Sequence, residues 1–184
     1  GKIVETRSEG TLEQAVSSLL RKGGEPLIRK GVDLAMRLLG RQFVTGRTID
    51  EALANARDRE ARGYTFSYDM LGEAAMTGAD AQRYYVAYDA AIHAIGRTAN
   101  GRGVFGGPGI SMKLSALHPR FCRAQRERVL AELTPKLITL ARLAKDYDIG
   151  FAIDAEEADR LEISLDLLAR LAADLDTANV GEPF

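Results

Sequence analysis

The sequence contains one cysteine, Cys122, so no intrachain disulfide can form. A chain without disulfides suits a reducing compartment. The sequence also lacks a run of about 20 apolar residues, the length that a membrane-spanning helix needs. Residues 1–6 hold no apolar region of the kind that a signal peptide requires. These absences predict a soluble, cytoplasmic protein.

The sequence also lacks an excess of positive or negative charge. The chain has 25 Lys and Arg against 26 Asp and Glu, a formal net charge of -1. Such a balance gives no bulk attraction to nucleic acid or to an anionic membrane. The basic stretch from Arg29 to Arg41 has no aromatic residues between its charges, so we interpret it as a solvated helix face. We therefore expect no nucleic-acid partner through this segment.

Patterns that bind metals or dinucleotides are missing as well. His93 has no second histidine or cysteine nearby in the sequence, and a metal site needs several convergent ligands. Gly101, Gly103 and Gly106 have the spacing of a G-x-G-x-x-G motif, but they follow a predicted helix and precede a predicted strand. A dinucleotide site requires the reverse order, because the phosphates must meet a helix N-terminus. We interpret these glycines as a loop.

The chain does contain an alternation of short apolar runs and long amphipathic segments. Strand-like runs occur at 64–70, 109–114 and 151–154. Helical periodicity predicts helices over 49–61, 80–99, 123–147 and 163–175. A helix that joins two successive strands of one sheet makes those strands parallel. The pattern predicts an α/β fold of about three βα units preceded by α-helices.

Three finer expectations concern one turn and two of the predicted helices. Residues 115–119 are expected to form a turn out of the second strand. Pro135 lies inside the 123–147 segment and is expected to kink it or divide it in two. The last helix is expected to point four leucines inward, namely Leu165, Leu168, Leu171 and Leu175.

Charged residues stand at the ends of the three strand-like runs. Asp69, Lys113 and Asp154 occupy these positions and are separated by nearly equal lengths of chain. The carboxyl ends of parallel strands meet at one edge of a sheet, where the following loops build binding sites. The spacing therefore predicts that these three side chains share one rim.

Two chemical roles are open for Lys113. Its ammonium can hold an anionic group such as a carboxylate, with a flanking aspartate keeping it charged and oriented. A neutral lysine amine can instead form a Schiff base with a carbonyl substrate, as in aldolase-type barrels. The residues by themselves do not separate these two roles.

Three stretches around these residues resemble a known family. Tyr64–Ala75, Gly107–Arg120 and Ile153–Glu162 are similar to the proline dehydrogenase domain of the bifunctional proline utilization A flavoenzymes. Three long matches in the right order are far more specific than a single short motif. The similarity extends from Phe43 to about Leu171.

The resemblance implies a distorted TIM-type (βα)8 barrel that binds FAD. It implies oxidation of L-proline to Δ1-pyrroline-5-carboxylate in proline catabolism, with membrane quinone as the electron acceptor and peripheral membrane association of the parent enzyme. It assigns four residues to the catalytic site. Lys113 helps to bind the proline carboxylate, Asp154 and Asp69 lie near the substrate, and Glu73 pairs with an arginine over the closed site. No residue is assigned to contact FAD.

The same comparison suggests how the chain is organised. We expect a helical arm or linker over 1–45, the first part of the barrel over 46–176 and a polar tail over 177–184. We expect neither a ribbon-helix-helix DNA-binding segment nor an aldehyde dehydrogenase domain. About three of eight units are present, so we expect an inactive fragment of a proline dehydrogenase. The alternative is a non-catalytic scaffold piece that self-associates through its open sheet edges.

Overall fold

The computed structural model describes residues 29–33, 35–36, 40, 44–72 and 74–177. The chain divides into two compact units, Gly1–Arg47 and Thr48–Phe184, and each is described by itself. In the first unit residues 29–33 and 35–36 are helical. Residues 1–28, 34, 37–39 and 41–43 of the expected arm lie outside the described residues, and the division at residues 45 and 176 stays a prediction.

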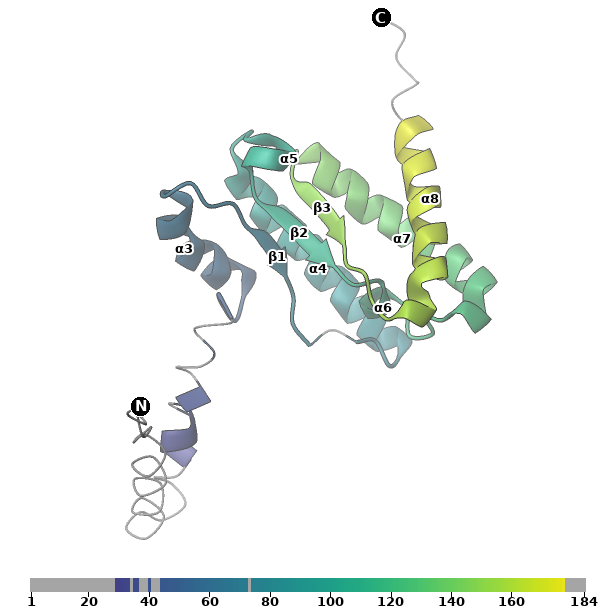
Figure 1. Cartoon of the computed structure of the whole chain (residues 1–184), viewed down its shortest axis with the longest axis horizontal. Helices are drawn as coiled ribbons and strands as arrows, with labels where there is room; N and C mark the ends of the chain where they lie inside the picture. Colours follow the sequence, from purple (N-terminus) through teal and green to yellow (C-terminus); the bar gives the residue numbers. More distant parts are fainter. Residues whose placement is uncertain (1–28, 34, 37–39, 41–43, 73, 178–184) are drawn as a thin grey trace, which may run out of the picture. The chain divides into compact units, whose positions relative to one another are not determined.

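The second unit is built on a three-stranded parallel sheet (Figure 1). The strands are β1 (Ser67–Asp69), β2 (Gly109–Met112) and β3 (Gly150–Ile153), and their order in the sheet is β1-β2-β3. Asp69 is the register partner of Ser111, and Ser111 is the partner of Ala152. All three strands therefore end at the same edge of the sheet.

The two faces of this sheet differ in character. Figure 1 shows α4 (Gly78–Ala99) and α7 (Arg126–Asp146) behind the strands, where they pack against β2 and β3. Ile110 and Met112 point to these helices and are buried. Ser67, Asp69 and Ala152 alternate with the helix-facing positions and are exposed. Within the described part of the chain, no helix covers this second face.

Two of the helices begin at residues whose side chains cap them. Thr77 and Asp80 form a reciprocal capping box at the start of α4. The Thr48 hydroxyl accepts the Glu51 N–H at the start of α3 (Ile49–Glu60). The remaining elements, in chain order, are α5 (Gly103–Gly106), α6 (Leu114–Leu117), η1 (Arg123–Gln125), η2 (Ala158–Arg160) and α8 (Leu161–Thr177).

Short helices replace two of the expected irregular segments. The glycine-rich segment contains α5, and the expected turn after the second strand begins with α6. Each of these helices has only four residues, too few for helical periodicity to appear in the sequence.

Pro135 does not divide the helix in which it lies. α7 runs unbroken from Arg126 to Asp146 with the proline inside it. A proline leaves the carbonyl four residues earlier without its helical donor. Here that carbonyl belongs to Ala131, which is exposed, as is Pro135. Water can therefore take the place of the missing N–H.

The expected inward face of the last helix was wrong in part. Leu171 is buried as expected, but Leu165 and Leu168 are 54% and 48% exposed. The buried stripe of α8 consists of Ile163, Leu167 and Leu171. The helix has apolar residues on two faces, so contact with α7 rather than periodicity selects the face that is buried.

This architecture is the expected fold class. A small parallel sheet with helical crossovers on one face corresponds to part of an α/β barrel. The core between sheet and helices is contributed mainly by β2, α4, α6 and α7. Over the described ranges, none of the helices combines the length and the apolar character needed to span a membrane.

Candidate functional site

The three charged residues expected at the strand ends lie together at one rim. The Lys113 Nζ is 2.8 Å from Asp69 Oδ1 and 2.9 Å from Asp154 Oδ2. The lysine thus bridges the first and third strands from the end of the second. The three side chains are 30% to 37% exposed, so a ligand from solvent can reach this charged rim.

Strand geometry accounts for the arrangement. Asp69 is the last residue of β1, while Lys113 and Asp154 each follow the last residue of their strands. The Asp154 N–H donates to the Met112 carbonyl at 2.9 Å, so backbone pairing continues to the rim. The fourth predicted site residue, Glu73, lies outside the described residues.

Ser111 is a member of the site that the sequence analysis missed. Its hydroxyl donates to Asp154 Oδ1, while Lys113 occupies Oδ2. Burial by itself would raise the pKa of Asp154, but the hydrogen bonds from Ser111 and Lys113 outweigh it and lower the pKa. Ser111 precedes Lys113 by two positions in a strand, and the period of two could have identified it.

Tyr88 is a second residue that the sequence analysis missed. Its ring is fully buried in α4, and its hydroxyl accepts the Lys113 backbone N–H at 3.1 Å. On the same helix the Tyr84 hydroxyl donates to the Gly72 carbonyl at 3.0 Å. The helix behind the sheet therefore holds the backbone at two of the strand ends, and one of these contacts places the lysine directly.

The contacts of Lys113 bear on its two open roles. Two carboxylates within 2.9 Å stabilise the charged ammonium and restrict its position. A Schiff base requires a neutral amine as nucleophile. The geometry therefore favours binding of an anionic group over Schiff-base chemistry. Asp69 and Asp154 offer acceptors to a cationic group at the same place.

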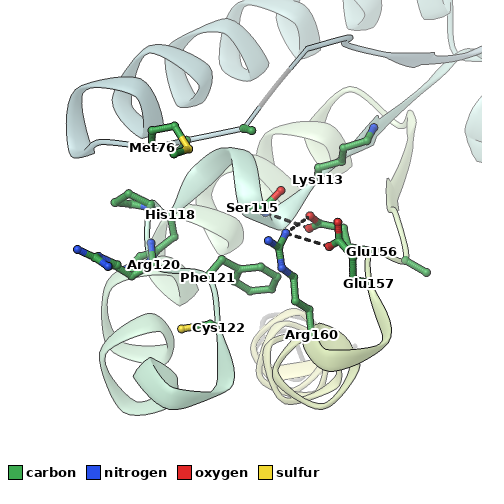
Figure 2. A pocket seen from close by; sticks show the side chains of 14 residues that line it. Met76, Lys113, Ser115, His118, Arg120, Phe121, Cys122, Glu156, Glu157 and Arg160 are labelled. Atoms are coloured by element: carbon green, nitrogen blue, oxygen red, sulfur yellow. Dashed lines mark hydrogen bonds and ion pairs between the residues drawn. The ribbon is translucent and has the colours of Figure 1, made fainter.

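Beside the rim lies a cavity of about 760 Å³, formed by the loops that follow the three strands (Figure 2). Lys113, Ser115, His118, Phe121, Glu156 and Arg160 contribute to its wall. In Figure 2 the Glu156 and Arg160 side chains lie side by side, joined by a hydrogen bond, and Arg120 points away from them. The loops of three successive βα units thus meet here, as in parallel α/β sites.

The wall of the cavity includes a buried histidine. His118 is 3% exposed; its Nδ1 accepts the Arg120 N–H, and its Nε2 lies 3.2 Å from Glu132 Oε2. Burial lowers the pKa of His118, and the Glu132 carboxylate opposes this only in part. We assign it as a neutral structural residue. In the described part of the chain, no three potential metal ligands come together.

Comparison with protein families gives two matches. Residues 52–182 match the family described as proline dehydrogenase. Residues 1–43 match the family described as the DNA-binding domain of proline dehydrogenase. The second match corrects our interpretation of this segment as a helical arm without a DNA-binding unit, because its sequence is similar to that domain. Residues 1–28, 34, 37–39 and 41–43 of it lie outside the described structure.

Individual relatives agree with the first match. The chain is 63% identical over 178 residues to the bifunctional protein PutA of Klebsiella aerogenes and 62% identical to that of Escherichia coli K12. Each alignment covers 97% of this chain and 14% of the relative. The chain thus spans about one seventh of the length of these proteins.

A solved structure shows the same fold. The chain matches a variant of proline utilization A from Bradyrhizobium japonicum with a TM-score of 0.66 and 49% sequence identity. The match covers 85% of this chain and 16% of that one.

Proposed function

This chain belongs to the proline dehydrogenase family and matches part of the PutA proteins. From that premise we propose that its charged rim serves the oxidation of L-proline to Δ1-pyrroline-5-carboxylate. The observation that carries the proposal is the Lys113 ammonium held between Asp69 and Asp154. It stands at the end of parallel strands, where such folds bind their ligands.

The rim complements a zwitterionic amino acid. The Lys113 ammonium attracts a substrate carboxylate, which competes with Asp69 or Asp154 for it. Two carboxylates and one ammonium leave the rim with an excess of negative charge, which suits the secondary ammonium of proline. Asp154 stays ionised across the neutral range because its pKa is lowered. We assign Lys113 to the carboxylate, and Asp69 and Asp154 to the substrate nitrogen.

The family's expected cofactor, FAD, would accept the hydride removed from proline. The side chains of Ser67, Ser111 and Ala152 on the uncovered sheet face are small, which would suit a planar ring that lies against this face. A pyrophosphate at Lys113 would instead lie against Asp69 and Asp154, and like charges repel. The described residues therefore fit the substrate and the ring, and we assign none of them to the phosphates.

Replacement of Lys113 by methionine tests the proposal. In the FAD-loaded PutA protein that contains this chain, K113M should lose roughly a hundredfold in kcat/KM for proline, because loss of a hydrogen bond between two charged groups costs on the order of 3 kcal/mol. The matched control is K145M, since Lys145 is an exposed lysine in the last turn of α7. Proline-dependent dye reduction is the measurement. Wild-type kcat/KM for proline in a K113M variant of the PutA protein that contains this chain would overturn the proposal.

A further inference from the structure

Glu156 lies two residues beyond Asp154, at the cavity floor, and is not used by the proposed chemistry. Its side chain is only 9% exposed. Both carboxylate oxygens are hydrogen-bonded: Oε1 accepts the Ser115 N–H at 3.0 Å, and Oε2 accepts Arg160 Nη1 at 2.9 Å (Figure 2). A buried carboxylate is costly unless it is paired in this way. The structure therefore holds Glu156 in one defined position.

The Ser115 N–H needs an acceptor from outside its own helix. Ser115 lies in the first turn of α6, where N–H groups have no intrahelical partners. Lys113 occupies the N-cap of α6 and makes no side-chain cap. A lysine side chain has no acceptor atom, whereas serine or aspartate would supply one. Glu156 provides the missing acceptor from the loop after the third strand.

Segments at the ends of the first and third strands contact the chain after the second strand at two places, Ser115 and Lys113. The Ser115 carbonyl accepts the Ala75 N–H at 3.2 Å, while the Ser115 N–H binds Glu156. Two residues earlier, Lys113 binds Asp69 and Asp154. Ser115 is thus bound from two sides, two residues after Lys113. The turn that follows Lys113 is held by the segments that follow Asp69 and Asp154.

Arg160 completes the support of Glu156. Its Nη1 also lies 3.1 Å from Glu157 Oε2, and its guanidinium carbon lies 5.9 Å from the centre of the Phe121 ring. The glutamates differ in their surroundings, because the Glu157 side chain is 67% exposed. Glu157 is therefore a neighbour of the same chemical type that shares Arg160, whereas the Ser115 N–H binds Glu156.

We infer that Glu156 is a positioning residue: it fixes the turn that follows Lys113 and thereby holds the lysine amine between Asp69 and Asp154. Its value for proline binding rests on the proposed function, whereas its effect on the amine does not. Loss of the Glu156 acceptor frees the Ser115 N–H and loosens the turn. The Lys113 amine then becomes more accessible to solvent and less well placed for a substrate carboxylate.

Reactivity of the Lys113 amine tests the inference without any substrate. Wild-type, E156A, E156Q and E157Q proteins are treated with acetic anhydride after their folding is confirmed by circular dichroism. Acetylation at Lys113 is measured by mass spectrometry relative to Lys145. E156A should raise the relative labelling roughly fivefold, the factor expected from loss of one hydrogen bond. E156Q should give a smaller increase, because its amide oxygen can still accept the Ser115 N–H. E157Q should match the wild type.

Two results would overturn the positioning role. One is wild-type labelling of Lys113 in folded E156A. The other is an equal rise in E156A and E157Q, which would assign the effect to charge near Arg160. If E156A does not fold, the relative acetylation of Lys113 is compared between E156Q and E157Q. Equal acetylation in these two variants would overturn the inference.

Kinetics of the FAD-loaded PutA protein that contains this chain separate this inference from the proposed function. Misplacement of a substrate-binding amine should raise KM for proline several-fold in E156Q with a smaller change in kcat. One result would overturn the proposed function and support the positioning role. In it the wild type does not oxidise proline, but Lys113 labelling still rises in E156A and, to a smaller extent, in E156Q. Normal proline oxidation by E156Q together with wild-type labelling would overturn the positioning role alone.

Discussion

Single hydrogen bonds to Asp154 decide its acid–base behaviour. Because its pKa in the folded state is lowered, its stabilising contribution is fully present above the ordinary aspartate value of about 4. The contribution is lost as pH falls through the lower, folded value. The Ser111 hydroxyl is one cause of this shift and also restricts the carboxylate that faces Lys113.

Replacement of Ser111 by alanine should therefore raise the pKa of Asp154 and reduce the acid-dependent part of the stability. The expected loss near neutral pH is about 1.5 kcal/mol, typical of a hydrogen bond to a charged group. Urea unfolding near neutral pH and near pH 3 measures it, since the difference between variant and wild type should shrink in acid. Ser67→Ala, on the exposed face of β1, is the control. An unchanged difference at both pH values would contradict the assignment.

Two tyrosine hydroxyls provide a contrast at the same scale. The Tyr68 hydroxyl is buried without a hydrogen-bond partner among the described residues. Burial, together with the nearby Glu60 carboxylate, raises the pKa of Tyr68 to about 12 against the opposing effect of Arg102. The Tyr88 hydroxyl is buried too but accepts the Lys113 N–H.

Replacement by phenylalanine should therefore have opposite effects at these positions. Tyr68→Phe should leave stability unchanged or raise it by up to about 1 kcal/mol, because it removes an unsatisfied polar group. Tyr88→Phe should cost about 1 kcal/mol, because the Lys113 N–H loses its acceptor. Chemical denaturation of both variants measures the difference. Equal losses would show that the Tyr68 hydroxyl is satisfied in solution.

At the scale of whole elements, α8 has apolar residues on two faces. Leu167 is fully buried, whereas its neighbour Leu168 is 48% exposed. Leu167→Ala should lower the free energy of unfolding by about 3 kcal/mol, because it opens a cavity against α7. Leu168→Ala should change it by about 0.5 kcal/mol or less. Thermal and urea unfolding of this adjacent pair would show which face is buried, and a reversed order would contradict the packing described here.

At the scale of the whole molecule, surfaces suited to association are present. β1 and β3 each lie at one side of the sheet, with no further strand beside them in the part of the chain that the structure describes. Leu161, Leu165 and Leu168 add an exposed apolar stripe on α8. Open strand edges and exposed apolar patches favour pairing with other chains.

We therefore expect the isolated chain to self-associate as its concentration rises. Light scattering over a concentration series measures this. The double variant Leu165→Lys/Leu168→Lys should reduce association that occurs through the α8 stripe and leave association through strand edges intact. A chain that remains monomeric throughout the series would contradict the expectation.

The sequence by itself determined much of the fold and three members of the site. Long periodic segments predicted α4 and α7, and caps such as Thr48 lay at the expected start of a helix. The charges at Asp69, Lys113 and Asp154 were predicted to share a rim, and they do. These features were readable because periodicity, capping and the parallel order of strands are local or topological properties of the chain.

The tertiary structure alone decided which of several local options is realised. Packing against α7 chose the Leu167 face of α8 over the Leu168 face. The contacts of Tyr88 with Lys113 and of Glu156 with Ser115 join segments 25 and 41 residues apart. Such contacts leave no periodic trace in a single sequence. Their existence depends on distances between elements, which are set only when the sheet and its helices pack together.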